Sequence, residues 1–334
     1  MTISVLIPTY RRPADLRRCL AALARQERRA DQVIVVARED DDESRACFES
    51  MAPIAAEQTL VRVREPGVVA AMNAGVAHAT GDVVALTDDD AAPWPDWLAR
   101  IERYFAGDER LGGVGGRDWI YRDGQLDNGR ATRCGELRWW GRLTSGHHHA
   151  APGIPREVHV LKGVNCAYRT PLLNRFGFDA RLAGAGAQVH WELSLGLALR
   201  RDGWTLLFDP GLGVDHYPAA RFDEDQRGRF NGVAQRNATA NETMVLAEHL
   251  PAVQRAVYLA WAGLIGTSAA PGLLQVPRLM LSGRRRVLPR WWATLRGRVA
   301  GLRMYRRSRR AAGAASTTTE LLNSHPLVVN GGTR

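Results

Sequence analysis

The chain has 334 residues, 45% of them hydrophobic, and its four cysteines lie far apart. This composition excludes a disordered chain and a disulfide-stapled secreted module, and it suits one large α/β domain with an appendage or two modest domains. Residues 278–310 contain twelve arginines and no acidic residue, so the net charge of +10 resides in that segment. The remainder is slightly acidic, which argues against nucleic acid as a partner. The basic segment instead suggests binding to an anionic surface.

Short apolar runs alternate with helical patterns in the first 90 residues. Continuous apolar runs predict strands that are buried on both faces at residues 3–7, 32–36, 60–63 and 82–87. Leucines at helical spacing predict a helix at residues 13–25, and a second helix is expected at residues 68–79. Because strands and helices alternate, we expect a parallel sheet with right-handed crossovers, and therefore an α/β fold.

The pattern continues with weaker signals up to about residue 250. Further strands are predicted at residues 111–116, 158–168 and 205–208. A helix follows Trp97, another is predicted at residues 191–201, and residues 121–155 have a loop-like composition rich in Gly, Arg and Trp. Since open parallel sheets bind ligands at the carboxyl ends of their strands, the polar clusters at such ends outline one site at residues 8–10, 39–40 and 88–90.

Three adjacent carboxylates, Asp88, Asp89 and Asp90, follow the fourth predicted strand. Such neighbours repel one another, so the arrangement is costly unless a cation binds there. Carboxylate oxygens favour Mg²⁺ or Mn²⁺, either of which can bridge to a diphosphate. The alternative is a solvated acidic turn that caps the next helix.

Several segments, taken in order, resemble the family-2 glycosyltransferases of the GT-A fold. They read VLIPTY at residues 5–10, EPG at 65–67, AAMNAG at 70–75 and GDVVALTDDD at 81–90. The resemblance covers about residues 1–220. It implies a Rossmann-like, mostly parallel sheet flanked by helices. It also implies an inverting, DxD-type enzyme that takes its sugar from a UDP- or GDP-type nucleotide-diphosphate donor.

The resemblance also implies roles for individual residues in binding the donor. The residues expected to bind it are Pro8, Thr9, Tyr10, Arg12, Asp40, Asn73, Asp88, Asp89 and Asp90. Residues 8–10 would line the nucleotide base, and Asp40 would contact the base or the ribose. The chain departs from the family's usual Asp-Asp-Gly-Ser at residues 37–40, and Met72 stands where an arginine is usual. These departures leave the nucleotide open.

The metal ligands implied by the resemblance are Asp88, Asp90 and His216, with Asp90 expected to contact the ion directly. Neutral imidazole can bind Mn²⁺ beside a carboxylate. The alternative for His216 is a histidine whose hydrogen bonds are satisfied within the core or at the surface.

An inverting transferase needs a carboxylate that removes the proton from the acceptor hydroxyl. Counted back from the Gly-Trp at residues 203–204, Glu192 occupies the place of the family's catalytic acid, and Trp191 replaces a second acid. His190 is the alternative base, and Glu192 could instead support the helix N-terminus electrostatically. Lys162, Trp191 and His190 are expected on the acceptor side, with a buried salt bridge as the alternative for Lys162.

The three histidines at residues 147–149 are expected to form a polar loop over the acceptor side, because no acid stands at ligand spacing from them. Residues 256–277 carry no charged side chain, but Pro271 should break a helix there. A helical hairpin, a re-entrant segment or a packed soluble helix pair remain open for this stretch.

The basic segment combines arginines with one apolar helical face formed by Trp291, Trp292, Leu295, Val299 and Leu302. This pattern is typical of an interfacial anchor on an anionic membrane. The N-terminus has no secretory signal pattern. We therefore expect a cytoplasmic protein that is peripheral or monotopic on the inner face of the cell membrane.

The domain organisation expected from these patterns is a catalytic domain followed by a basic appendage. Its parts are a GT-A domain at residues 1–245 (nucleotide-sugar half 1–110, acceptor half 111–245), a helical membrane-associated segment at 246–311 and a disordered tail at 312–334. The acceptor would be a glycan or a lipid-linked molecule.

Two other functions remain open. A nucleotidyltransferase is disfavoured because the loop after the first strand is not glycine-rich. A non-catalytic GT-A-like binding protein is disfavoured because Asp88, Asp90 and Glu192 are all present.

Overall fold

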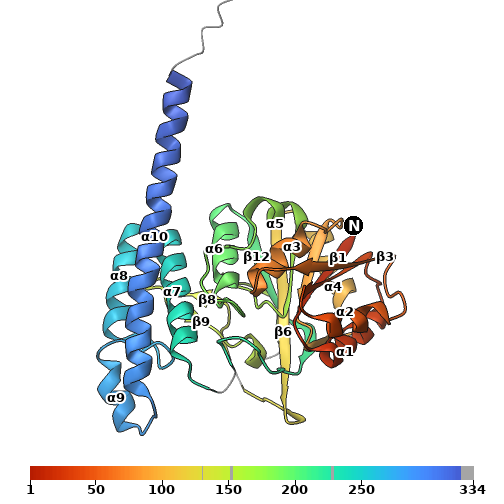
Figure 1. Ribbon diagram of the computed structural model, residues 1–334, viewed down its shortest axis with the longest axis horizontal. Helices are drawn as coiled ribbons and strands as arrows, with labels where there is room; N and C mark the ends of the chain where they lie inside the picture. The colour runs from red at the N-terminus through yellow and green to blue at the C-terminus, as the bar shows by residue number, and fades with distance from the viewer. Residues whose placement is uncertain (130, 151–152, 227–228, 325–334) are drawn as a thin grey trace, which may run out of the picture.

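The structure is a computed structural model that describes the chain except residues 130, 151–152, 227–228 and 325–334. It contains a sheet region, residues 1–231, and a helical unit, residues 232–324 (Figure 1). The main strands are β1 (Ile3–Thr9), β2 (Gln32–Arg38), β3 (Glu57–Val63), β4 (Val83–Thr87), β5 (Ala91–Pro93), β6 (Leu111–Arg122), β10 (Arg156–Glu157), β11 (Asn165–Arg169) and β12 (Thr205–His216).

These strands form one mixed sheet in the order β10-β12-β6-β11-β4-β1-β2-β3. β5 pairs with β12, and β7 (Gln125–Leu126) pairs with β6. Strands β1 to β4 are parallel, as are β6 and β12, whereas β11 runs antiparallel between β4 and β6. The prediction of a mostly parallel sheet flanked by helices is confirmed.

Both faces of the sheet are covered, which explains its continuous apolar strands. The flanking helices are α1 (Pro13–Ala24), α2 (Asp42–Glu49), α3 (Val68–Val76), α4 (Trp97–Gly107), α5 (Thr170–Phe176) and α6 (Trp191–Arg201). Along β1, Val5 and Ile7 pack in one apolar cluster with Leu16 of α1, while Leu6 packs in the other with Met72 of α3. A strand buried on both faces needs apolar side chains at successive positions.

Two strands extend further than their apolar runs predict. β6 and β12 each span 12 residues, beyond the predicted 111–116 and 205–208. They continue past a register shift between Asp209 and Gly213, and this extension carries Asp118 and His216 to the carboxyl edge of the sheet. The predicted strand at residues 158–168 is shorter in the structure, because a turn closed by Asn165 N donating to Lys162 O at 3.0 Å interrupts it.

The predicted loop region at residues 121–155 contains only short elements in its described part. They are β7, β8 (Glu136–Leu137), β9 (Leu143–Thr144) and the 3₁₀ helix η1 (His147–His149).

The helical unit consists of α7 (Gly232–His249), α8 (Ala252–Leu264), α9 (Gln275–Leu281) and α10 (Val287–Ser324). α7 spans the domain boundary expected at residue 245. α10 runs 13 residues past residue 311, so the expected disordered tail is corrected to helix for residues 312–324. Alanines at residues 311, 312, 314 and 315 are strong helix formers and account for the extension. The rest of that tail lies outside the described residues.

Small residues let α10 lie close against α7. A Cβ atom at Gly301 would lie 2.3 Å from Ala240 O, and one at Gly297 would lie 2.6 Å from Arg236 O. The buried face of α10 is therefore not the predicted apolar face, which points elsewhere. None of the helices in the described part of the chain combines the length and apolarity that crossing a bilayer requires.

Candidate active site

The carboxyl ends of β1, β4 and β12 and the start of α6 border a cavity of about 650 Å³. Because β1 and β4 are adjacent parallel strands, the residues that follow them meet at one edge. Thr9 Oγ1 donates a hydrogen bond to Asp89 Oδ2 at 2.7 Å. The predicted residues that line this cavity are Pro8, Thr9, Tyr10, Arg12, Asp88, Asp89, Lys162, Trp191, Glu192 and His216.

The three carboxylates after β4 have different surroundings. Asp89 is buried and held by Thr9 and by Arg12, whose Nη1 lies 3.1 Å from Asp89 Oδ1. Burial raises the pKa of Asp89 to about 7, although the Arg12 guanidinium acts against the shift. Asp90 is also buried and accepts a hydrogen bond from Ala219 N at 2.9 Å. Arg12 thus supplies part of the positive charge that the acidic cluster needs.

Asp88, Asp90 and His216 could together hold a metal ion, since one candidate ligand atom from each lies within 4.8 Å of the others. His216 Nε2 lies 3.3 Å from Asp90 Oδ1. The opposite ring nitrogen, Nδ1, lies 3.2 Å from Asp118 Oδ2. Two carboxylates and an imidazole held by a third carboxylate form a donor set that suits Mn²⁺, and a carboxylate behind the imidazole orients such a ligand.

Asp118 is a site residue that the sequence analysis missed. It is fully buried on β6 beside β12, where it faces both His216 and the ammonium group of Lys162. Burial alone would raise its pKa, but the hydrogen bond with His216 and the Lys162 ammonium hold the pKa of Asp118 below its ordinary value. No motif marks this residue, because its role depends on the pairing of two distant strands.

Glu192 lies in the first turn of α6 and is half-buried at the cavity wall. Burial raises the pKa of its carboxyl above the ordinary value. Gly163 lies against this wall, where a Cβ atom would come within 2.3 Å of the Trp191 ring and 3.3 Å of Glu192 Oε1. A carboxylate of raised pKa at the edge of a cavity can act as a general base.

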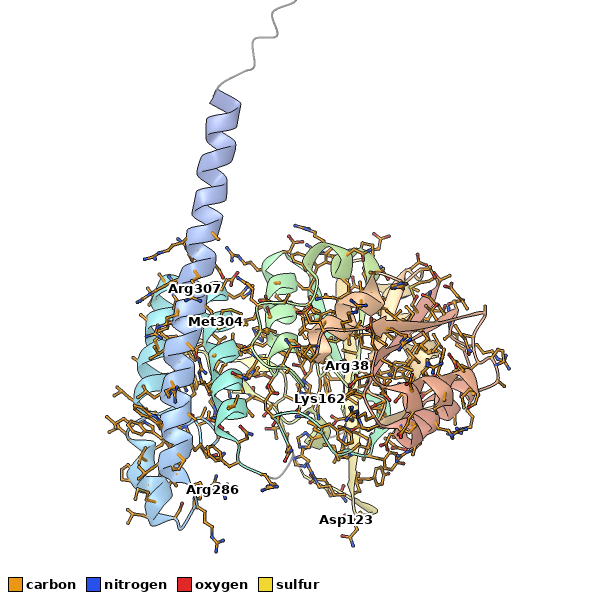
Figure 2. The ribbon with its side chains drawn as sticks, viewed as in Figure 1. Arg38, Asp123, Lys162, Arg286, Met304 and Arg307 are labelled. Atoms are coloured by element: carbon orange, nitrogen blue, oxygen red, sulfur yellow. The ribbon has the colours of Figure 1, made fainter. Side chains whose placement is uncertain are left out.

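Further side chains of the cavity wall carry positive charge. Arg38, Arg122 and Arg221 line the cavity but are not among the predicted site residues. Figure 2 shows Arg38 and Lys162 in the middle of the sheet region. The loop after β12 closes over the same side, with the Phe222 ring 6.2 Å from the Tyr10 ring in an edge-on contact.

Comparison with known proteins identifies the family. The family model described as glycosyl transferase family 2 matches residues 4–176, more than half of the chain. The chain belongs to this family. This confirms the resemblance and favours a glycosyltransferase over a nucleotidyltransferase. The succinoglycan biosynthesis protein ExoM of Rhizobium meliloti (strain 1021) is 34% identical over 102 residues. The match spans 30% of this chain and 33% of ExoM, so about a third of that relative's length is matched.

Solved structures of low sequence identity share the fold of this family-2 chain. The mannosyltransferase PcManGT from Pyrobaculum calidifontis, in complex with GDP-Man and Mn²⁺, has a TM-score of 0.54 at 19% identity, over 90% of this chain and 86% of that one. S. aureus TarS 1-349, in complex with UDP-GlcNAc, has a TM-score of 0.58 at 14% identity, over 93% and 92% of the two chains. The GT-A fold expected from the sequence is thereby confirmed.

Four predicted residues of this family-2 chain do not line the cavity: Asp40, Asn73, His190 and Asp90, of which Asp90 lies behind the lining in the cluster with Asp88 and His216. Asp40 is exposed and lies 3.2 Å from the Tyr10 hydroxyl and 3.2 Å from Arg11 Nη2. Asn73 uses its side-chain amide to bond both backbone groups of Phe178, at 2.8 and 2.9 Å. These polar groups have protein partners in the structure, and a contact of Asp40 or Asn73 with the donor stays a prediction.

His190, the alternative base, also lies off the cavity. It is the N-cap of α6 with a φ of 81°, and burial lowers the pKa of its ring while Glu242 of α7 acts against that shift. Lys162 and Trp191 do line the cavity, and Lys162 also forms the ion pair with Asp118 that its alternative interpretation anticipated. Trp191 is buried against Phe178, with ring centroids 5.2 Å apart.

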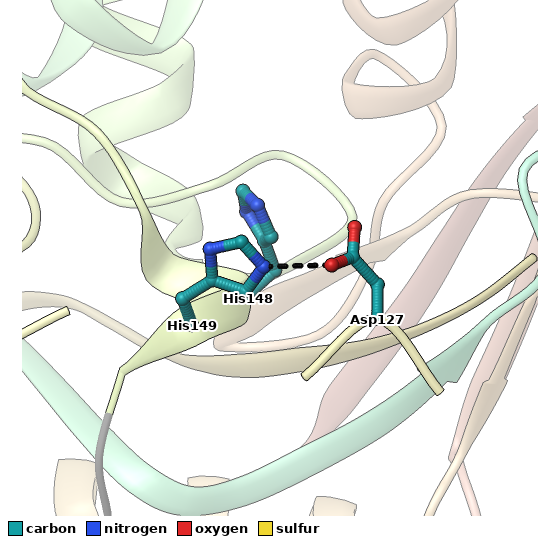
Figure 3. Close-up of side chains that lie close together, drawn as sticks. All are labelled: Asp127, His148 and His149. Carbon is teal, nitrogen blue, oxygen red and sulfur yellow. Dashed lines mark hydrogen bonds and ion pairs between the residues drawn. The ribbon is translucent and has the colours of Figure 1, made fainter. Parts of the chain in front are cut away.

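A second cluster lies beside the cavity, where the histidine run meets an acid. His149 Nε2 lies 3.0 Å from Asp127 Oδ1, and His148 stands next to them (Figure 3). Asp127 lies 21 residues before His148, so spacing alone could not reveal it. Burial lowers the pKa of His148 to about 4, so this ring is neutral near pH 7. The hydrogen bond to Asp127 and the bond from His147 Nε2 to Val160 O anchor the segment that was expected to be a polar loop.

Proposed function

We propose that this protein is a metal-assisted, inverting glycosyltransferase that transfers a sugar from a nucleotide-diphosphate donor to an acceptor hydroxyl. The observation that carries the proposal is that Asp88 and His216 of the Asp88–Asp90–His216 cluster line the same cavity as Glu192. The related folds support a nucleotide-sugar donor, since one was solved with GDP-Man and Mn²⁺ and another with UDP-GlcNAc.

The residues of the cluster fit a divalent metal ion, Mg²⁺ or Mn²⁺. Asp88, Asp90 and His216 would hold the ion, and Asp118 fixes the ring of His216 by its contact with Nδ1. Bound there, the ion would neutralise the negative charge that develops on the departing diphosphate. Arg12 remains beside the cluster and keeps Asp89 in its hydrogen bond with Thr9.

The base of the nucleotide would lie against residues 8–10 at the end of β1. Tyr10 offers an aromatic surface there, held by Phe222 on one side and by the Arg38 guanidinium 5.1 Å from its ring centroid. Arg38 and Arg221 line the same cavity and can bind phosphate oxygens by charge-assisted hydrogen bonds. These side chains together would orient the donor with its diphosphate towards Asp88.

Glu192 would act as the general base of a single displacement. Its carboxylate accepts the proton of the acceptor hydroxyl as that oxygen bonds to the anomeric carbon of the sugar. The bond from that carbon to the diphosphate oxygen breaks in the same step, so the nucleoside diphosphate leaves and the configuration inverts. Burial raises the pKa of Glu192, which makes its carboxylate a stronger base than a fully solvated one.

The acceptor and the cellular location belong to the same proposal. The acceptor would be a glycan or a lipid-linked molecule, and the enzyme would act in the cytoplasm, attached to the inner face of the cell membrane. The twelve arginines of residues 278–310 support an anionic membrane partner. The slightly acidic remainder of the chain argues against a nucleic-acid partner.

The proposal is tested by measuring nucleoside-diphosphate release from a panel of UDP- and GDP-sugars in the presence of Mn²⁺, where water or an added glycan provides the hydroxyl that takes the sugar. We expect release from one donor, loss of release on chelation, and loss in Asp90→Asn. Asp215→Asn is the matched control, because Asp215 adjoins His216 in sequence but accepts a hydrogen bond from Trp94 Nε1 at 3.1 Å. Equal loss in both variants, or release from no donor, would contradict the proposal.

A further inference from the structure

Exposed apolar side chains gather at one end of the helical unit. Of seventeen large hydrophobic residues that are exposed in the described part of the chain, eleven lie within residues 253–299. Eight of these form what we call the apolar tip: Leu264, Ile265, Leu273, Leu274, Met280, Leu281, Leu288 and Trp292. Their exposed fractions run from 45% for Ile265 to 90% for Leu281. Apolar groups gathered in this way mark an interaction site.

The backbone holds the apolar tip together. Leu274 N donates to Leu264 O at 2.8 Å, which fixes the segment before α9 against the end of α8. Arg284 N donates to Leu279 O at 3.3 Å, which turns the chain from α9 into α10. Figure 1 shows α9 and the beginning of α10 at the same end of the helical unit. The tip is therefore a surface built from ordered elements.

Positive charge surrounds the apolar tip. Arg278, Arg284, Arg285 and Arg286 are exposed, and within the described residues none of them forms an ion pair with an acid. Figure 2 shows Arg286 at this end of the molecule. The sequence has no acidic residue between positions 256 and 319. An apolar surface bordered by cations is complementary to anionic headgroups above acyl chains.

We propose that the apolar tip inserts into the interface of an anionic lipid bilayer while the surrounding arginines bind the headgroups. The proposal deepens the membrane attachment of the proposed function, on which it rests, by naming the surface that binds. A second copy of the chain is a poorer occupant, because two tips in contact would bring two arginine clusters together. An anionic bilayer can bury the exposed leucines among its acyl chains and pair the arginines with its headgroups.

A pocket lies between the start of α10, which carries Leu288 and Trp292 of the tip, and the sheet region. Arg290, near the start of α10, borders this pocket of about 370 Å³ together with Gln188 and Glu224 of the sheet region. Glu224 and Val189 border this pocket and the main cavity as well. Docking by the tip would thus bring the bilayer close to a pocket that adjoins the main cavity, which favours a lipid-linked acceptor.

The test is flotation of the full chain with vesicles of phosphatidylcholine alone or mixed with phosphatidylglycerol, at low and high salt. We expect binding to the anionic vesicles that weakens with salt. The double variant Leu274→Glu, Leu281→Glu should bind at least about tenfold more weakly, because each leucine loses its burial in the interface. The triple variant Arg284→Ala, Arg285→Ala, Arg286→Ala should lose about a hundredfold, at about a factor of five for each arginine.

The matched control is Val253→Glu, which places the same charge on an exposed apolar residue at the opposite end of α8. Val253 is 73% exposed. It should bind vesicles like the wild type. The proposal would be overturned if the wild type did not bind vesicles or if Val253→Glu lost as much binding as the leucine variant. It would also be overturned if the wild type formed a dimer and the leucine variant were a monomer.

A separate readout keeps the two proposals apart. The tip variants should release nucleoside diphosphate at the wild-type rate, whereas Glu192→Gln should keep vesicle binding. Failure of the transferase proposal would therefore appear in release and not in flotation.

Discussion

The sheet region and the helical unit place their charged side chains in opposite ways. In the sheet region, charged groups are buried and paired across strand ends, as in the contacts of His216 with Asp90 and Asp118. In the helical unit, the arginines of residues 284–286 are exposed beside exposed leucines. Burial strengthens electrostatic interactions with a bound diphosphate, while exposure leaves charge available to a surface. This difference supports the proposals that the sheet region carries out the chemistry and that the helical unit attaches the chain to a membrane.

The largest expected effect falls on the catalytic side of this comparison. Glu192→Gln keeps the size of the side chain but cannot accept the proton of the acceptor hydroxyl. We expect kcat to fall about 10²- to 10⁴-fold, the usual contribution of a general base, with little change in KM for the donor. Steady-state kinetics with the identified donor and acceptor measure both constants. A variant that retains wild-type kcat would remove Glu192 from the mechanism.

The next effect sharpens the role of the buried pairs. Asp118→Asn weakens the orientation of the His216 ring, so we expect the apparent Mn²⁺ affinity to fall about 10- to 100-fold. Titration of activity with Mn²⁺ gives this affinity. Lys162→Met serves as the companion variant, since it removes the other partner of Asp118 and leaves the contact with His216. Loss of the Lys162 cation should by charge alone strengthen Mn²⁺ binding. If Lys162→Met instead weakens it as much as Asp118→Asn, the effect belongs to disruption of the buried cluster and not to the orientation of the His216 ring.

The pH dependence should report the burial of Glu192. Because burial raises its pKa above the ordinary value of 4.5, the carboxyl is protonated, and inactive as a base, over a wider acidic range. We expect kcat/KM to fall about tenfold per pH unit below that raised pKa and to level off above it. The residual activity of Glu192→Gln should lack this acidic limb. If the fall of kcat/KM at acidic pH is unchanged in the variant, it reports the titration of another group.

The smallest expected effect concerns how α10 is held on α7. Gly301→Ala would place a Cβ atom 2.3 Å from Ala240 O, so α10 must shift and the free energy of unfolding should fall by about 1–3 kcal/mol. Gly263→Ala on α8 meets no atom within 4 Å and should instead raise it by up to about 1 kcal/mol. Denaturant unfolding of the pair measures both changes. If both variants changed the free energy of unfolding in the same direction, the close packing of α10 on α7 would be contradicted.

The sequence predicts the sheet and the strand-end cluster because both depend on local patterns. Apolar runs predict the strands, and the acids after β4 stand where parallel strands end. His216 is joined to Asp88 and Asp90 only through the family resemblance. Asp118 and Asp127 could not be found, because each acquires its partner only when distant segments pair. Asn73 was expected at the donor, but its amide bonds Phe178, which lies 105 residues away.

The helical unit was predictable in character but not in arrangement. The apolar face that includes Trp292, Leu295 and Val299 is exposed, as an interfacial helix requires. The sequence did not reveal that the small residues of α10 bury the opposite face against α7, nor that the helix continues to Ser324. Packing of this kind depends on how closely two backbones can approach, which a single helical pattern does not encode.

The most direct test of the account is calorimetric binding of a panel of nucleoside diphosphates, with and without Mn²⁺, to the wild type and to Asp90→Ala. We expect that one nucleoside diphosphate binds, that Mn²⁺ strengthens this binding, and that the variant loses the Mn²⁺-dependent part. A folded wild-type protein that binds none of the nucleotides would contradict the assignment of the cavity as a donor site.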